Sequence, residues 1–405
     1  MPPENASIST ILARLQNWIF ARTDQFTAGR NWVLKVLLLC VFFSIFFSGG
    51  IDFGWGEHGP YPEGYFKKID HPLMDVAKIS GLNSNEANLN FRLTVPVLLH
   101  LAGIHSHESL PILTILAIGS ILLATCMVAY RITGDRVCAC FIALNVSATY
   151  VGSFGFIFCY DAIAICQLAW ACLPGMKWWG RCLLVFTASF TDERAFMASG
   201  LLLVGYFFLP VCRGGIFARL RQPNFLAVAT AMFLYVIGRL ILMKVVGLSS
   251  PTGGCGGGCF IHNVGHFLHP AIWFALKGGW LFYGLALIAL AGNKNYRSVG
   301  VLLLATLGFL GFALMIGDVL KSTVYIFPLL FICLTVVRQN ETLTLCRTYC
   351  LLAFLISALG GDYNVYISKI TWFQPLVVHW LQMGLQALYD WLYFVLPHTI
   401  PRPST

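Results

Sequence analysis

Long apolar stretches recur along most of this chain and are separated by short polar loops. Windows of about 19 residues detect such stretches at roughly 32–49, 110–130, 137–156, 162–175, 178–191, 195–211, 224–246, 271–291, 298–317, 322–337 and 346–360. A helix needs roughly 20 apolar residues to cross the hydrocarbon core of a bilayer, and most of these stretches approach that length. The pattern predicts an all-α, polytopic bundle of transmembrane helices.

The two ends of the chain depart from this pattern. Residues 372–397 are apolar but contain His379, Gln382 and Asp390, so this segment could span the membrane or lie along its surface. We therefore expect 11 or 12 spans. The expected organisation is a cytoplasmic N-terminal segment (1–31), a transmembrane domain (32–360) with a long first outer loop (50–109), and a C-terminal part (361–405) holding an outer loop and the last span.

The N-terminal segment has apolar residues at helical spacing. Ile8, Leu12, Leu15 and Ile19 share one face, which predicts an amphipathic helix on the membrane surface. A helix packed on its own protein would show the same pattern, so both interpretations stay open.

Composition and charge agree with a membrane protein. Of the 405 residues, 58% are hydrophobic and only 11% are charged, and the mean hydropathy is +0.75. The net charge of +9 is spread over short loops on one predicted side, which identifies that side and the N-terminus as cytoplasmic and gives no indication of nucleic-acid binding. Twelve of the 17 acidic residues fall on the opposite face, either because acids avoid the positive loops or because that face carries the chemistry.

Three consecutive charges, Asp192, Glu193 and Arg194, stand between two apolar stretches in the segment SFTDERAFMAS. The preceding stretches, 162–175 and 178–191, are shorter than a full span, so they could form a tilted pair or a re-entrant hairpin. In either case the chain should enter the membrane and return to the same face. Asp161 and Glu193 should then share the outer face. Charges at membrane depth usually face a cavity or pair with one another, although Arg194 could simply neutralise its neighbours.

The first outer loop adds further candidates. Asp52 follows the first span within GGIDFG, Glu57 comes five residues later, and glycines and aromatic residues surround both. Arg92 precedes a short apolar helix in FRLTVPVLLHLAGI, where its guanidinium suits a bidentate phosphate contact or a snorkelling position.

The order of GGIDFG, FRLTVPVLLHLAGI, CYDAIAI and TDERA resembles the layout of polytopic glycosyltransferases of the GT-C type, and of bacterial GT-C-like proteins of uncertain substrate in particular. The resemblance covers roughly residues 30–210. It implies a GT-C-like fold in the bacterial inner membrane and transfer of a sugar from a polyprenyl-phosphate donor to a glycan, lipid or protein acceptor on the outer face.

The resemblance also implies roles for single residues. Asp52 would be the general base, and Asp161 and Glu193 would orient sugar hydroxyls or a divalent metal. Arg92, with Lys67, Lys68 or Arg194, would hold the departing phosphate. Tyr160 and Glu57 complete the expected substrate-binding set, and no cofactor is assigned beyond that metal.

A second segment, residues 251–270, contains residues that could bind a metal. Cys255, Cys259, His262, His266 and His269 could hold an ion, the two cysteines could form a disulfide, or the segment could be a flexible loop. Most of the 14 cysteines fall inside apolar stretches, where we expect small hydrophobic side chains.

Two other functions fit the same pattern. Membrane-embedded carboxylates at Asp161, Glu193, Asp318 and Asp362 could line the path of a transporter or ion channel. A polysaccharide polymerase or ligase would share the outer active face, but the short loops after residue 210 do not favour it.

Overall fold

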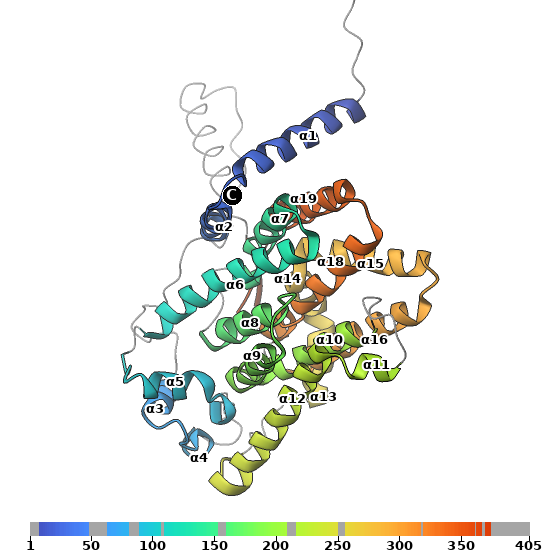
Figure 1. The fold of residues 1–405 in the computed structure, drawn as a ribbon. Coiled ribbons are helices and arrows are strands. Elements are labelled where there is room, and N and C mark those ends of the chain that lie inside the picture. Colours follow the sequence, from blue (N-terminus) through green and yellow to red (C-terminus); the bar gives the residue numbers. More distant parts are fainter. Residues whose placement is uncertain are drawn as a thin grey trace, which may run out of the picture.

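A computed structural model describes residues 8–47, 63–80, 89–106, 109–152, 159–208, 216–249, 256–316, 319–360, 362–366 and 369–373. These residues form a bundle of helices (Figure 1). The N-terminal half contains α1 (Ile8–Phe26), α2 (Trp32–Phe47), α3 (Glu63–Asp70), α4 (Val76–Ser80), α5 (Thr94–Leu101), α6 (Ser109–Thr133), α7 (Arg136–Ser147), α8 (Cys159–Ala171), α9 (Trp178–Thr191) and α10 (Glu193–Phe208). The C-terminal half contains α11 (Ile216–Leu220), α12 (Pro223–Ile241), α13 (Gly256–His266), α14 (Leu268–Leu276), α15 (Trp280–Gly292), α16 (Tyr296–Leu314), α17 (Val319–Val324), α18 (Pro328–Asn340) and α19 (Leu343–Leu359).

The helical bundle agrees with the expected fold class, with one unforeseen element. Strands β1 (Asp362–Tyr366) and β2 (Lys369–Phe373) form an antiparallel hairpin after α19. Within the described residues, four helices are long and apolar enough to cross a membrane: Ser109–Thr133, Pro223–Val246, Tyr296–Leu314 and Lys321–Asn340. The segment 374–405, which includes the expected last span, lies outside the described residues, as does Asp318.

Two expected spans are interrupted in the structure. The stretch 271–291 divides into α14 and α15 at a 3-10 turn, Lys277–Gly279. Within Lys321–Asn340, counted above as one candidate span, a short turn at residues 325–327 separates α17 from α18. The first amide hydrogen of a helix has no partner within the helix, so a proline at the first position loses no hydrogen bond. Pro328 is therefore a favourable first residue for α18. Hydropathy alone misses both breaks because the side chains around them remain apolar.

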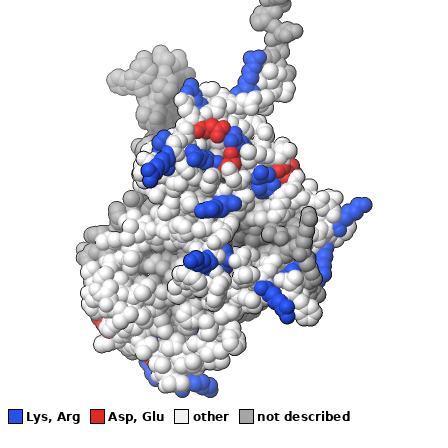
Figure 2. All heavy atoms as spheres, viewed as in Figure 1, with Lys and Arg blue, Asp and Glu red and all other residues white. Residues whose placement is uncertain are grey.

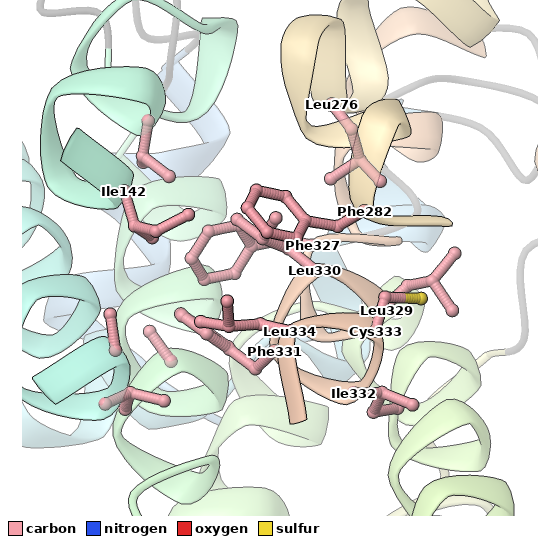
Figure 3. Packing of buried hydrophobic residues seen from close by; sticks show 14 of the residues in the cluster. Ile142, Leu276, Phe282, Phe327, Leu329, Leu330, Phe331, Ile332, Cys333 and Leu334 are labelled. Carbon is pink, nitrogen blue, oxygen red and sulfur yellow. The ribbon is translucent and has the colours of Figure 1, made fainter. Parts of the chain in front are cut away.

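Helix α18 lies in the middle of the bundle. Its side chains Phe327, Leu330, Phe331 and Leu334 are almost fully buried and pack toward Ile142 of α7 in Figure 3. Leu276 and Phe282 lie near Phe327 and Leu330 in the same view, next to the interruption between α14 and α15. A helix that is apolar all round belongs in such a central position.

The turn at Lys277–Gly279 is fixed by interior polar contacts. Lys277 donates to the Ala148 carbonyl at 2.6 Å, and the Gly278 amide donates to the Ser357 hydroxyl at 2.8 Å. That hydroxyl donates in turn to the side-chain oxygen of Asn145 at 2.7 Å. These contacts satisfy backbone groups that the broken helix would otherwise leave exposed in an apolar interior.

Gly278 leaves no space for a side chain, which gives a first prediction. A Cβ at this position would overlap the carbonyl oxygen of Ala353 on α19, a backbone atom that cannot move alone. We expect Gly278→Ala to lower the free energy of unfolding by about 1–3 kcal/mol. Gly284→Ala on α15, where a Cβ meets nothing within 4 Å, is the matched control. Equal stability of the two variants, measured by denaturant unfolding in detergent, would contradict this packing.

Charged groups lie at both ends of α18. At its C-terminal end, Arg338 donates to the Thr133 carbonyl, and Arg347 forms ion pairs with Asp24 at 2.9 Å and Asp135 at 2.6 Å. At its N-terminal end, Tyr325 belongs to the cluster described below. A helix of 13 residues separates the two groups by about 20 Å. On the face shown in Figure 2, basic side chains are scattered over a largely uncharged surface, with acidic ones beside them near the upper end.

The amphipathic N-terminal helix is present as α1. Near its start Ile11, Leu12, Leu15 and Trp18 are exposed, whereas Phe20 is buried against Phe141 of α7. Packing on the protein is thus shown for part of the helix, and the location on a membrane surface stays a prediction. The second half of α1 packs on the protein, and its first half extends from the bundle with an uncovered apolar face (Figure 1).

Candidate functional site

The junction between α9 and α10 places the three charges of the TDER segment. Helix α9 ends at Thr191, and Asp192 is extended (φ −153°, ψ 130°). The Asp192 carboxylate accepts a hydrogen bond of 2.9 Å from the Arg194 amide, so it caps the start of α10. Glu193 then occupies the first turn, where the helix dipole favours a negative charge.

Arg194 lies at the centre of a buried ion network. Its guanidinium donates to Asp192 at 2.8 and 2.7 Å and also to Asp161, at the start of α8. The Tyr325 hydroxyl donates to the same Asp161 oxygen at 3.3 Å, and the Tyr325 ring stacks under the guanidinium at 5.1 Å. Asp161, Asp192 and Arg194 are 4%, 0% and 6% exposed. The guanidinium of Arg194 thus holds the two aspartates together. Because it is buried between them, Arg194 is poorly placed for the phosphate contact expected from the sequence.

Arg92 and Glu193 form the more accessible part of the cluster. The Arg92 guanidinium donates to both Glu193 oxygens, at 3.2 and 3.0 Å, and lies 3.1 Å from the Asp192 carboxylate. The Glu193 side chain is 33% exposed and that of Arg92 is 12% exposed. Glu193 is therefore the carboxylate of this cluster that another molecule can reach, and Arg92 is the cation beside it.

The segment before α5 brings Arg92 to this position. The Leu93 amide donates to the Phe190 carbonyl at 2.7 Å, and the Thr94 hydroxyl donates to the Thr187 carbonyl at 2.8 Å. Both carbonyls lie near the end of α9, and that of Phe190 is one of the last four of the helix, which have no partner within its ladder. Two segments separated by about 100 residues are thereby locked together at the charge cluster.

Lys68 is placed differently from the expectation of a phosphate ligand. Its ammonium is buried and donates to the carbonyls of Met74 at 2.8 Å and Asn90 at 3.2 Å. Burial lowers the pKa of Lys68 to about 8, against the opposing effect of the nearby Asp75 carboxylate. Lys68 holds the α3–α4 segment to the Asn90 turn, and Lys67, by contrast, is exposed.

Asp75 connects the same α3–α4 segment, called the outer segment after its predicted location, to the residues that follow α12. Its carboxylate accepts hydrogen bonds from the Asn90 side chain at 2.7 Å and from the Ser249 amide and hydroxyl at 3.0 and 2.7 Å. Burial opposes ionisation, but the hydrogen bonds from Ser249 and Asn90 prevail and lower the pKa of Asp75 from 3.8 to about 2. The outer segment is therefore fixed to the bundle by an ionised group.

This pKa gives a second prediction. Because the pKa is depressed in the folded state, the stabilisation is fully present above about pH 4 and is lost as the pH falls toward 2, a contribution of about 2 kcal/mol. We expect Asp75→Asn to remove that part of the pH dependence of unfolding in detergent. Asp70→Asn, whose side chain is 56% exposed, is the control and should keep it. An unchanged acid profile in Asp75→Asn would contradict the assignment.

Of the remaining residues predicted for the site, the structure describes some and not others. Asp52 and Glu57 lie outside the described residues, as does Cys255. Tyr160 is 1% exposed and packs with Ile69, Leu89 and Val95 beneath the outer segment, so it supports the site rather than lining it.

Among the described side chains neither expected metal site shows a group of three ligands, and Cys255 and the Cys259 side chain lie outside the described part. His262 and His266 lie one turn apart on α13 with ring centroids 4.7 Å apart, and both are exposed. Among the described residues, neither this pair nor the acids Asp161, Asp192 and Glu193 belong to a group of three ligand atoms within 4.8 Å.

An aromatic and apolar flank borders the charge cluster. Tyr235 of α12 packs against Phe190 and Phe196 with ring centroids 4.8 and 5.0 Å apart, and its hydroxyl accepts from Arg239 at 2.9 Å. The outward face of α12 is exposed and apolar, with Phe233, Leu234, Val236, Ile237, Leu240 and Ile241 uncovered. The polar site therefore lies next to a surface suited to lipid chains.

Sequence reasoning missed several members of the site. Tyr325 stands 164 residues from Asp161 within an apolar stretch, and only its hydroxyl distinguishes it there. Asp75, Asn90 and Ser249 lie in three separate loops with no shared motif. Their contacts depend on helix packing, so no local pattern could have indicated them.

Comparison of the chain with protein-family models, curated proteins and solved structures found no match.

Proposed function

We propose that this protein is an integral membrane glycosyltransferase that transfers a sugar from a polyprenyl-phosphate donor at the Arg92–Glu193 pair. The observation that carries the proposal is this accessible carboxylate and guanidinium, set on a buried ion network and beside an exposed apolar helix. The N-terminus would be cytoplasmic, the site would face the opposite side, and the proposed location is a bacterial inner membrane.

The proposed chemistry uses the two kinds of group in different ways. A carboxylate takes the proton of the acceptor hydroxyl while that oxygen bonds to the anomeric carbon. The bond from that carbon to the phosphate oxygen breaks, and the leaving phosphate carries away the electron pair beside a cation. Arg92 fits the second role because its planar guanidinium can bridge Glu193 and a phosphate. Glu193, or Asp52 from the first loop, would supply the carboxylate.

The buried network supports this pair by fixing its position. Arg194 holds Asp161 and Asp192, and Asp192 in turn lies 3.1 Å from Arg92. A catalytic pair must be held within a fraction of an ångström of its working geometry. In this proposal Asp161 and Arg194 are positioning residues and do not contact the sugar.

A lipid-linked donor also needs an apolar surface next to the polar site. The exposed face of α12 offers it, and the segment Pro223–Val246 is one of the four helices able to cross a membrane. The polyprenyl chain would lie along α12 and its phosphate would reach Arg92.

Reconstituted protein tests the proposal directly. Proteoliposomes are incubated with labelled polyprenyl-phosphate sugars and candidate lipid, glycan and peptide acceptors, and products are detected by mass spectrometry. We expect transfer by the wild type and loss of transfer by Glu193→Gln, with Glu341→Gln at the other end of α18 as the active control. Full activity of Glu193→Gln would exclude Glu193, and products extended by many sugars would favour a polymerase.

One observation favours a transporter as a second candidate. The polar side chains of Lys277, Asn145 and Ser357 are buried within the bundle, as expected along an ion or proton path. Proton or ion flux into the same proteoliposomes, abolished by Lys277→Met and independent of any sugar donor, would support transport over transfer.

A further inference from the structure

Three buried cysteines come together where α7 meets α19. The sulfur atoms of Cys138, Cys346 and Cys350 all lie within 4.8 Å of one another, and each residue is 0% exposed. Thiol hydrogen bonds connect Cys346 with both of the other cysteines. The two helices run beside each other at the upper end of the bundle in Figure 1, away from the Arg92–Glu193 pair.

The local sequence explains this convergence. Cys346 and Cys350 are four residues apart on α19 and therefore share one face of the helix. Cys138 lies in the first turn of α7, where its amide donates to the capping Asp135 carboxylate at 2.8 Å. Helix α19 also begins nearby, with the Thr342 hydroxyl as its cap. The three sulfur atoms thus lie beside the N-terminal parts of both helices.

The thiolate is the form of cysteine that binds metals. The positive end of a helix dipole stabilises negative charge in the first turn, where Cys138 of α7 lies. The charges of Arg338 and Asp135 act on Cys346 in opposite directions, and Arg347 lies beside Asp135 with a side chain that is 21% exposed. The cluster is therefore dry but lies close to a charged end of the bundle, from which an ion could enter.

We infer that Cys138, Cys346 and Cys350 form a three-coordinate site for a soft monovalent metal ion, Cu(I). Thiolate ligands select soft ions such as Cu(I) over hard ions such as Mg²⁺ or Ca²⁺. Zn²⁺ normally takes four ligands, and within the described chain no fourth His, Cys, Asp or Glu joins this group. Each thiol that binds the ion releases its proton to water, so no oxidant or reductant takes part.

Binding of Cu(I) to the full-length protein in detergent tests the site. Under anaerobic, reducing conditions, Cu(I) is titrated against a chelator of known affinity, and X-ray absorption identifies the ligand atoms. We expect one Cu(I) per chain with three sulfur ligands. Cys346→Ser and Cys350→Ser should each weaken binding by at least about 100-fold, because even outer partners of metal ligands contribute 10–100-fold.

Matched controls distinguish this site from general thiol binding. Cys140→Ser changes another buried cysteine of α7 that lies outside the group, and it should bind Cu(I) as the wild type does. The spectrum of the wild type keeps the test valid even if a serine variant misfolds. A nitrogen or oxygen ligand shell, tighter retention of Zn²⁺ than of Cu(I), an equal loss in Cys140→Ser, or a disulfide within the group under these conditions would overturn the inference.

Discussion

Arg194→Met is expected to lower the free energy of unfolding by about 3–5 kcal/mol, because it leaves two buried carboxylates without their shared cation. Arg194 is 6% exposed and donates to both Asp161 and Asp192. Methionine fills a similar volume, so the loss should come from uncompensated charge rather than from a cavity. Chemical unfolding of the purified protein in detergent measures it.

A multiple replacement separates charge from packing. Asp161→Asn and Asp192→Asn, added to Arg194→Met, remove all the buried charges and should restore a large part of the lost stability. Arg22→Met on the exposed face of α1 is the control and should change stability by less than about 0.5 kcal/mol. If Arg194→Met unfolds no more easily than Arg22→Met, the buried network does not stabilise the fold.

Arg92→Lys is expected to lower kcat/KM of the proposed transfer reaction by about 10²–10³-fold, as for the loss of one preorganised donor. Lysine keeps the positive charge but cannot donate two parallel bonds to Glu193, which Arg92 does at 3.2 and 3.0 Å. This prediction rests on the proposed function. Initial rates with a polyprenyl-phosphate sugar in proteoliposomes provide the measurement.

Stability must be followed in the same variant. Because lysine keeps the positive charge beside the buried Asp192 and the Glu193 side chain is 33% exposed, Arg92→Lys should cost little stability, on the order of 1 kcal/mol or less. Arg22→Lys is the control for activity. A variant that keeps its stability and loses transfer supports a role in the reaction, whereas unchanged transfer would remove Arg92 from the site.

The charge cluster illustrates how far local sequence reasoning extends. The two short apolar stretches before TDER indicated a chain that enters the membrane and returns to the same face. In the structure, these stretches form α8 and α9, and Asp161 contacts Arg194. The charges had two interpretations, a working cavity or mutual neutralisation. In the structure Asp161, Asp192 and Arg194 neutralise one another, and only Glu193 with Arg92 remains accessible.

The expected phosphate ligands show the limits of the same reasoning. A lysine next to an apolar loop can face water or turn inward, and Lys68 turns inward because two carbonyls accept from its ammonium. The cysteines are a second example. Their apolar surroundings indicated small hydrophobic side chains, but the spacing of Cys346 and Cys350 by four residues was a visible signal of a shared face.

By itself, the sequence determined the helical bundle and most helix positions, because hydropathy and periodicity act over a few residues. The tertiary structure decided that Arg92 pairs with Glu193, that Tyr325 joins Asp161, that α14 and α15 separate at Lys277, and that three thiols from two helices meet. These contacts join residues that stand far apart in the chain. They depend on which apolar faces pack together, and nearly uniform apolar helices leave that choice open until the whole bundle forms.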